Sequence, residues 1–182
     1  AIKSSLPFMH FFDGFRTSHE VNKIEVMDYS VFDRLLDREA VKKFRTRGLN
    51  SAHPVTKDTA QNDDVHFQAK EVQSKYYVPV ADIVNEYMQE ISKETGRSYA
   101  PFSYYGAPDA NRVIIAMGSV TDTIREVVDY LNAQGEKVGL LAVHLYRPFS
   151  KKYFFNALPK QLRKLLFQIE LKNLVPQENH YT

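Results

Sequence analysis

Cysteine and tryptophan are both absent from this chain of 182 residues. Without cysteine there is no disulfide, no cysteine nucleophile and no thiolate-bound metal within these residues. No apolar run approaches the roughly 20 residues that a membrane-spanning helix needs, and no charged leader with an apolar centre marks a secretory signal. A large excess of charge is missing too. The 24 Lys and Arg residues against 22 Asp and Glu give a net charge of +2, so composition predicts neither nucleic acid nor a membrane as a partner.

The composition that remains is that of a globular protein with one domain or two small ones. Hydrophobic residues make up 43% of the chain and charged residues 25%, values ordinary for a packed core with a solvated surface. A basic cluster is short and interrupted, so we interpret it as a solvated helix face; its members are Lys42, Lys43, Arg45 and Arg47. The six histidines show no pair at helical spacing and no HExxH arrangement, so we predict no metal site.

In the first half, the pattern predicts one strand and two helices. Lys23–Tyr29 alternates as a short strand does, and Tyr29–Phe44 has helical spacing with Ser30 available as N-cap. His53–Asp64 is a polar run that we expect to be a loop. The clearest helix follows Pro79 and ends before Gly96; its apolar stripe is Val80, Ile83, Val84, Tyr87, Met88 and Ile91. Residues 96–109 are interpreted as a packed linker.

The second half predicts a βαβ unit, and hence an α/β fold class with a parallel sheet. Apolar runs at Arg112–Met117 and Val138–Leu145 are typical of buried strands, and helices are expected at 121–132 and 151–158. Gly118 and Ser119 follow the first strand, where parallel sheets often bind ligands. Because a single glycine falls far short of a dinucleotide fingerprint, we interpret this pair as a structural turn.

One segment fits neither a helix nor a strand period. Pro7–Glu20 (PFMHFFDGFRTSHE) combines four phenylalanines, two histidines, two acids, an arginine and a glycine. Such a stretch either lines a site or forms a buried connecting loop whose polar groups have fixed partners. The candidate pocket residues are His10, Asp13, Arg16 and His19, which could orient substrate or thiamine; satisfied core histidines are the alternative. We predict no catalytic residue in this chain.

The same segment begins a series of five stretches that carry a family resemblance. The others are TAQNDDVHFQAKE (59–71), YYGAPDANRVIIAMGSVTDTI (104–124), VVDYLNAQGEKVGLL (127–141) and LYRPFSKKYFFNALPK (145–160). Their order resembles that of the pyruvate:ferredoxin (flavodoxin) oxidoreductases, which are thiamine-diphosphate enzymes of anaerobic metabolism. The resemblance covers residues 1–165 and implies that this chain is an internal piece of a longer protein.

The resemblance also implies a division of the chain into three parts. Residues 1–104 would be the C-terminal part of a pyrimidine-binding domain, and residues 105–165 the start of a core domain II similar to the C-terminal domain of transketolases. The tail, 166–182 (LFQIELKNLVPQENHYT), departs from the family. Codons exist for it that read AVPDRTKEPGAPGEPLY in the neighbouring frame, which is close to the family's continuation. We therefore expect a frame shift near Leu166.

The activity that the resemblance implies belongs to the whole enzyme. It oxidatively decarboxylates pyruvate with coenzyme A to acetyl-CoA and carbon dioxide, and [4Fe-4S] clusters pass the electrons to ferredoxin or flavodoxin. Thiamine diphosphate with Mg²⁺ supplies the nucleophile that attacks the keto carbon. The thiamine-activating glutamate would lie upstream, and the diphosphate motif and cluster cysteines downstream. We therefore expect no cofactor bound by this segment alone and no activity from the isolated chain.

Several points stay open at the level of sequence. The full-length enzyme is expected to be a homodimer, in the cytoplasm of an anaerobic prokaryote or in a hydrogenosome or mitochondrion-related organelle of an anaerobic protist. One alternative is a pyruvate:NADP oxidoreductase, and another is a non-catalytic truncated product or scaffold domain. If the first half lacks its upstream strands, its phenylalanines should lose part of their packing; these are Phe8, Phe11, Phe12 and Phe15.

Overall fold

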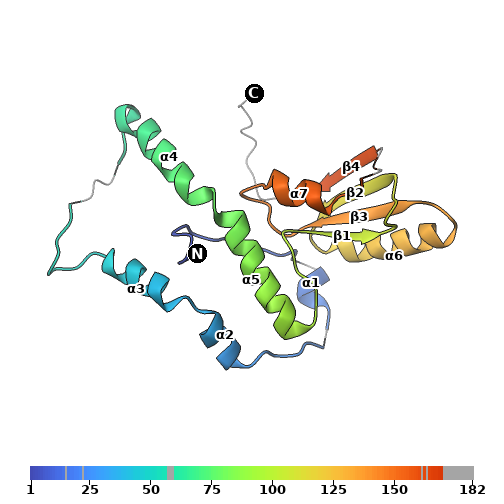
Figure 1. Ribbon diagram of the computed structural model, residues 1–182, viewed down its shortest axis with the longest axis horizontal. Helices are drawn as coiled ribbons and strands as arrows, with labels where there is room; N and C mark the ends of the chain where they lie inside the picture. Colours follow the sequence, from blue (N-terminus) through green and yellow to red (C-terminus); the bar gives the residue numbers. More distant parts are fainter. Residues whose placement is uncertain (15, 22, 57–59, 161, 163, 170–182) are drawn as a thin grey trace. The chain divides into compact units, whose positions relative to one another are not determined.

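The structure is a computed structural model that describes residues 1–14, 16–21, 23–56, 60–160, 162 and 164–169 (Figure 1). Its contacts divide the chain into two compact units. The first contains Ala1–Phe11, Val21–Pro101 and Leu145–Ser150, and the second contains Phe12–Glu20, Phe102–His144 and Lys151–Thr182. Each unit thus takes a short segment from the other half of the sequence. Among the described residues, no helix is both long and apolar enough to cross a bilayer.

The first unit is helical. Its helices are α2 (Tyr29–Leu35), α3 (Arg38–Thr46), α4 (Asp63–Tyr77) and α5 (Val80–Thr95). The predicted stripe lies on α5 as expected: Val80 is buried and the other five members are half-buried. Gly96 ends this helix with φ of +66°, a left-handed conformation that glycine adopts without a steric penalty.

Three predictions in the first unit are wrong. Lys23 and the described residues that follow it are irregular up to α2, and the single helix expected at Tyr29–Phe44 is two helices. The break has a local cause, because the Asp37 carboxylate accepts a hydrogen bond from the Ala40 N–H at 2.9 Å and caps a new helix. Asp28, not Ser30, caps α2: its carboxylate accepts from the Ser30 N–H at 2.8 Å.

Helix α4 was not predicted, although the preceding polar run does contain irregular backbone. It begins at Asp63, the first acid of the quoted motif, and has Asp63 and Asp64 in its first turn. Acids are favourable there because they face the positive end of the helix dipole. Nearly all of its side chains are exposed. Because no face of this helix is buried, its sequence carries no apolar stripe from which a helix could be predicted.

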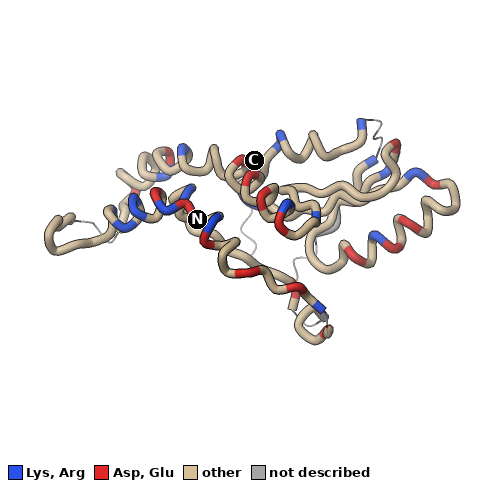
Figure 2. The backbone as a smooth tube through the Cα atoms, turned by 60° about the horizontal axis from the view of Figure 1, so that its bottom comes forward, with Lys and Arg blue, Asp and Glu red and all other residues tan. Residues whose placement is uncertain are grey.

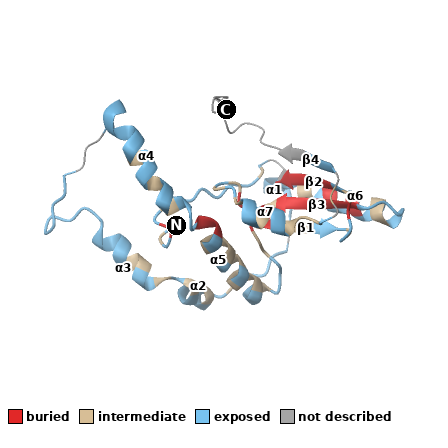
Figure 3. Ribbon diagram, turned by 45° about the horizontal axis from the view of Figure 1, so that its top comes forward, coloured by how far each residue is buried: buried red, intermediate tan, exposed pale blue. Residues whose placement is uncertain are grey.

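Most of the first half of the chain is exposed (Figure 3), and its exposed residues include large apolar side chains. Phe8, Phe11 and Phe12 are 46%, 42% and 70% exposed, as the expectation of incomplete packing requires; its proposed cause, the missing upstream strands, stays a prediction. Phe15 lies outside the described residues. Figure 3 shows burial concentrated in the strands of the second unit and at the start of α5.

The second unit is a four-stranded sheet with helices. The strands are β1 (Phe102–Gly106), β2 (Arg112–Met117), β3 (Val138–Val143) and β4 (Lys164–Ile169), in the order β1-β3-β2-β4. β2 is parallel to both β3 and β4, and β1 is antiparallel to β3. The helices are α1 (Arg16–His19), α6 (Val120–Ala133) and α7 (Lys151–Ala157). The predicted βαβ unit is therefore confirmed, with β2 at its predicted bounds.

Strand β1 replaces the linker that the sequence suggested. Phe102 is 3% exposed and meets Phe154 edge to face, with ring centroids 5.5 Å apart. The pairing runs from Phe102 opposite Val143 to Gly106 opposite Gly139. A five-residue strand bounded by proline and glycine gives little local signal, and its partner lies more than thirty residues away in sequence.

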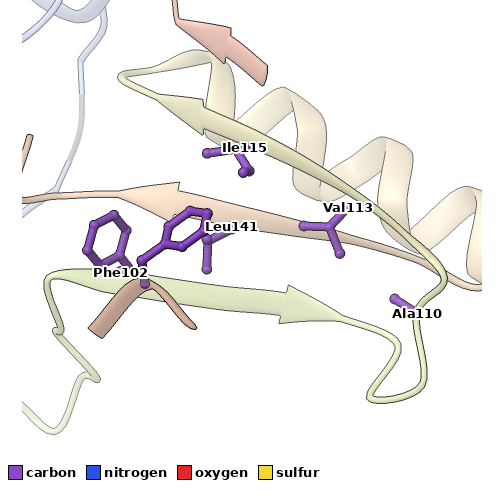
Figure 4. Packing of buried hydrophobic residues seen from close by; sticks show 6 residues of the cluster. Phe102, Ala110, Val113, Ile115 and Leu141 are labelled. Atoms are coloured by element: carbon purple, nitrogen blue, oxygen red, sulfur yellow. The ribbon is translucent and has the colours of Figure 1, made fainter. Parts of the chain in front are cut away.

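The core of this unit has two clusters because successive strand residues face opposite sides. Val113, Ile115 and Leu141 belong to one cluster, with Phe102, Ala110 and Phe154 (Figure 4). The other cluster contains Ala116 and Leu140, packed with Ile124 and Val128 of α6. Charged residues avoid the buried strands: β2 has one charged residue and β3 none, whereas the partly exposed helix α6 has charges of both signs (Figure 2).

The expected tail begins inside β4, so part of it is described. Leu166 lies opposite Ile114 and Ile169 opposite Met117 in the parallel pairing with β2. Residues 170–182 lie outside the described residues. Strand pairing depends on backbone groups and apolar spacing, so it leaves the frame-shift prediction untested.

Candidate functional site

The candidate site is the turn between β2 and α6. Gly118 and Ser119 follow the carboxyl end of β2 and precede Val120, the first residue of α6. Parallel sheets present ligand sites at this edge, where the N–H groups at a helix start face outward without partners in the helix. The geometry of this turn therefore decides whether it can hold a ligand.

Asp13 fills the start of α6. Its Oδ2 accepts a hydrogen bond from the backbone N–H of Ser119, across 106 positions of sequence. A carboxylate is favourable here because the helix dipole gives its N-terminus a partial positive charge. The position that an external anion would take is thus occupied by an internal carboxylate.

Gly118 makes this close approach feasible. A Cβ at this position would lie 2.7 Å from Oδ2 and 2.9 Å from Oδ1 of Asp13. Such distances are shorter than van der Waals contact, so any side chain would displace the carboxylate. Gly118 also has φ of +91°, where residues with a Cβ are strained. Both observations require glycine at this position, for different reasons.

The hydrogen bonds also tune the acid. Contacts with the Ser119 side chain, and then with its backbone N–H, lower the pKa of Asp13, while partial burial raises it to a smaller extent. Hydrogen bonds to the ionised form favour that form. Asp13 is therefore a carboxylate at neutral pH, suited to accept hydrogen bonds and unsuited to act as a general acid.

The four candidate residues from the sequence do not form one group. Asp13, Arg16 and His19 belong to the second unit and His10 to the first. Of these, Asp13 contacts the turn between β2 and α6 through the Ser119 N–H. His19 is exposed, and its Nδ1 lies 3.0 Å from Oγ of Ser18. Arg16 begins α1, and its side chain lies outside the described part of the structure.

His144 is a titratable residue at the same sheet edge that sequence reasoning did not select. It directly follows β3, as Gly118 directly follows β2, and these strands are parallel neighbours. Burial, and then the positive charge of Arg125, lower the pKa of His144. The residue as a whole is nevertheless exposed. Its position after a buried strand was the signal available in the sequence.

A second cluster joins β1 to α6. The Tyr105 hydroxyl donates to the Asp129 carboxylate, with both oxygens 2.8 Å away, and Arg125 lies 5.5 Å from the centre of the Tyr105 ring. The hydrogen bond to Asp129 raises the pKa of Tyr105. A phenol with a raised pKa stays protonated at neutral pH, so Tyr105 connects β1 to α6 and is not itself a base.

The first unit has an open pocket of about 510 Å³ lined by residues of both charges. Two of its three cations have described partners. Lys3 Nζ forms an ion pair with Glu86 at 2.8 Å, and Arg47 donates to Ser5 Oγ at 3.0 Å. The lining also contains the acids Asp37 and Glu39, so the pocket has mixed charge and is not a purely basic site for a phosphate.

The turn between β2 and α6 does not fit the diphosphate of thiamine diphosphate with its Mg²⁺. Among the described residues, no three His, Asp or Glu side chains lie together in a way that could hold a metal ion. Asp13 already accepts the Ser119 N–H at the turn, and a second anion there would meet its negative charge. We therefore derive no chemical step through the cofactor from this chain.

Comparison with known proteins gives two family matches in sequence order. Residues 1–89 match the model described as pyruvate flavodoxin/ferredoxin oxidoreductase, thiamine diphosphate-binding. Residues 110–174 match pyruvate:ferredoxin oxidoreductase core domain II. The second match begins within the turn that precedes β2 and includes β2, α6, β3, α7 and β4.

Individual relatives give the same result. A pyruvate-flavodoxin oxidoreductase of Enterobacter agglomerans is 58% identical over 165 residues, 91% of this chain and 14% of that protein. A pyruvate:ferredoxin oxidoreductase of Moorella thermoacetica is 48% identical over 164 residues, 90% of this chain and 14% of that protein. The mitochondrial pyruvate dehydrogenase [NADP(+)] of Euglena gracilis is 46% identical over 164 residues, 90% of this chain and 9% of that protein.

One solved structure is also similar, at a level that carries no argument of its own. It is a 2-oxoglutarate:ferredoxin oxidoreductase from Magnetococcus marinus, with a TM-score of 0.39 and 18% identity over 59% of this chain and 16% of that chain. The sequence matches carry the assignment. The chain spans about one seventh of the length of bacterial relatives such as that of Enterobacter agglomerans, of which it covers 14%, and it belongs to the pyruvate:ferredoxin (flavodoxin) oxidoreductase family.

Proposed function

We propose that the longer protein to which this chain corresponds oxidises pyruvate with coenzyme A to acetyl-CoA and carbon dioxide. Electrons would leave through [4Fe-4S] clusters to ferredoxin or flavodoxin. The observation that carries this proposal is 58% identity over 165 residues with a pyruvate-flavodoxin oxidoreductase. Two consecutive family models that match in order support it independently of any single relative.

Within that enzyme, the chain contributes framework. The first unit would form part of the domain that binds thiamine diphosphate, and the second would form the start of core domain II. The sheet edge supports this role, because its anion position holds the carboxylate of Asp13. Other parts of a homodimeric enzyme would supply the remaining groups that bind thiamine diphosphate with Mg²⁺, the coenzyme A site and the cluster cysteines. Its proposed location is the cytoplasm of an anaerobic prokaryote or an anaerobic organelle.

The test uses the full-length gene product. The transcript is sequenced on both sides of this segment, and the encoded protein is purified without oxygen. Coenzyme A-dependent reduction of ferredoxin, flavodoxin or a viologen dye by pyruvate is then measured, with omission of coenzyme A as the control. Turnover that requires both pyruvate and coenzyme A is expected. A full-length protein loaded with thiamine diphosphate and clusters that shows no such turnover would overturn the proposal.

A second candidate changes the electron acceptor. The relative from Euglena gracilis is named for NADP and is 46% identical over 164 residues, so the same core exists with another acceptor. NADP reduction by the full-length protein, with none of flavodoxin or ferredoxin, would select this candidate. A transcript that ends without catalytic domains would instead select a truncated product or scaffold.

A further inference from the structure

A short segment of the first half belongs structurally to the second unit. We call Phe12–Glu20 the strap. Residues on both sides of it, Ala1–Phe11 and Val21–Pro101, group with the first unit, whereas the strap groups with the sheet. A segment of nine residues that leaves its neighbours in this way needs a specific attachment, because ordering it costs conformational entropy.

We infer that Asp13 is the latch that holds the strap on the second unit, by serving as an internal anion at the start of α6. The attachment has two sides. On the strap, the Asp13 carboxylate accepts the Ser119 N–H. On the sheet, Gly118 leaves the space that the carboxylate fills, since its missing Cβ would lie 2.7 Å from Oδ2.

The latch is selective for a carboxylate in this position. Ser119 N–H is one of the first N–H groups of α6 and has no acceptor within the helix. Hydrogen bonds to an ionised acceptor are stronger than neutral ones. The first turn of α6 has its own acid, Asp122, yet the N–H of Ser119 is bound by Asp13. Asp122 is therefore the matched control for charge alone.

This attachment determines what the strap carries. Arg16 and His19 follow Asp13 within the same nine residues and group with the sheet, whereas His10 groups with the helical unit. The latch therefore holds the ionisable residues of the strap with the sheet of the second unit. This inference depends on contacts within the second unit and stands whether or not the proposed function is correct.

The experiment uses the 182-residue chain with Asp13→Ala, Asp13→Asn, Gly118→Ala and the control Asp122→Asn. Trypsin cleavage after Arg16 and amide exchange at Ser119 are measured, with amide exchange in β2 and β3 as the check on the sheet. Asp13→Ala and Gly118→Ala should each speed cleavage about tenfold or more, as loss of a charge-assisted hydrogen bond predicts. Asp13→Asn retains an acceptor and should give a smaller increase, while Asp122→Asn should give none.

A double variant with substitutions on both the strap and the sheet completes the test. Asp13→Ala with Gly118→Ala should speed cleavage no more than the stronger single variant, because both remove one attachment. Unchanged cleavage in Asp13→Ala would overturn the inference, as would equal effects of Asp13→Ala and Asp122→Asn. Loss of protection in β2 and β3 with Asp13→Ala would also overturn it, because Asp13 would then support the sheet and not the strap. If Gly118→Ala fails to fold, the Asp13 variants decide alone.

Discussion

Replacing Gly139 by alanine tests the packing between β1 and β3. Gly139 is a buried residue of β3, and the Tyr104 side chain of β1 lies across it. A Cβ on Gly139 would lie 2.7 Å from Cε2 and from Cζ of the Tyr104 ring and would also meet its hydroxyl. The ring is fixed at its far end, because its hydroxyl donates to the Ala107 carbonyl. The tyrosine must therefore move if a methyl group is added.

The expected cost combines three contributions. Overpacking a buried site costs about 1 to 3 kcal/mol, and loss of the Tyr104 hydrogen bond costs about 0.5 to 1.5 kcal/mol. The reduced freedom of alanine in the unfolded chain returns about 0.5 to 1 kcal/mol. The net loss is about 0.5 to 4 kcal/mol, with about 2 kcal/mol as the central value.

Native-state amide exchange of β3 is the appropriate measurement, because the two units need not unfold together. A loss of about 2 kcal/mol corresponds to a roughly thirtyfold decrease in protection. Gly14→Ala is the matched control, since a Cβ on Gly14 would meet no atom within 4 Å. It should leave β3 protection unchanged.

The role of the tyrosine is isolated by repeating the substitution in a Tyr104→Leu background. Without the ring, Gly139→Ala should cost much less, and the difference is the coupling between the two positions. A neutral or stabilising Gly139→Ala would refute the packing argument. An equal loss in both backgrounds would show that something other than Tyr104 opposes the methyl group.

Four further predictions concern the whole chain. The isolated chain should not turn over pyruvate, and coenzyme A-dependent viologen dye reduction by the purified chain, free of contaminating enzyme, would contradict this. Genomic DNA near the Leu166 codon should encode RTKEPG in the adjacent frame; its absence within one nucleotide would leave the tail as genuine divergence. Amides of β2 and β3 should exchange slowly and those of the first unit faster, with self-association through exposed apolar side chains; a monodisperse monomer with uniform protection is the contrary outcome. Because the pKa of His144 is lowered in the folded state, stability should be complete above about pH 6.5, the unfolded value, and should decrease as pH falls below it. His144→Gln should remove this small decrease in an acid titration followed by circular dichroism, and an unchanged decrease would assign it to another group.

The sequence by itself determined the elements whose signal is local. The apolar run of β2 and the stripe of α5 both specify burial through spacing alone, and both lie where the pattern places them. Gly96 marks the end of α5 because its left-handed conformation favours glycine. The family, too, follows from linear order, because motifs retain their sequence whatever their contacts.

Tertiary structure decided the features that depend on distant partners. β1 exists because its backbone pairs with β3, and FSYYG alone does not specify that pairing. The helix break at Asp37 depends on a competing cap that periodicity does not measure. The two units also exchange short segments, which no local pattern could indicate.

The candidate site shows the same division. Sequence selected Asp13 for its unusual surroundings and Gly118–Ser119 for its place after a strand, but it treated them as separate features. Only the folded chain brings the carboxylate to the Ser119 N–H, 106 positions away. The physical reason is that an unpaired N–H at a helix start donates to any suitable anion, and the sequence does not specify which acid of the chain will reach it.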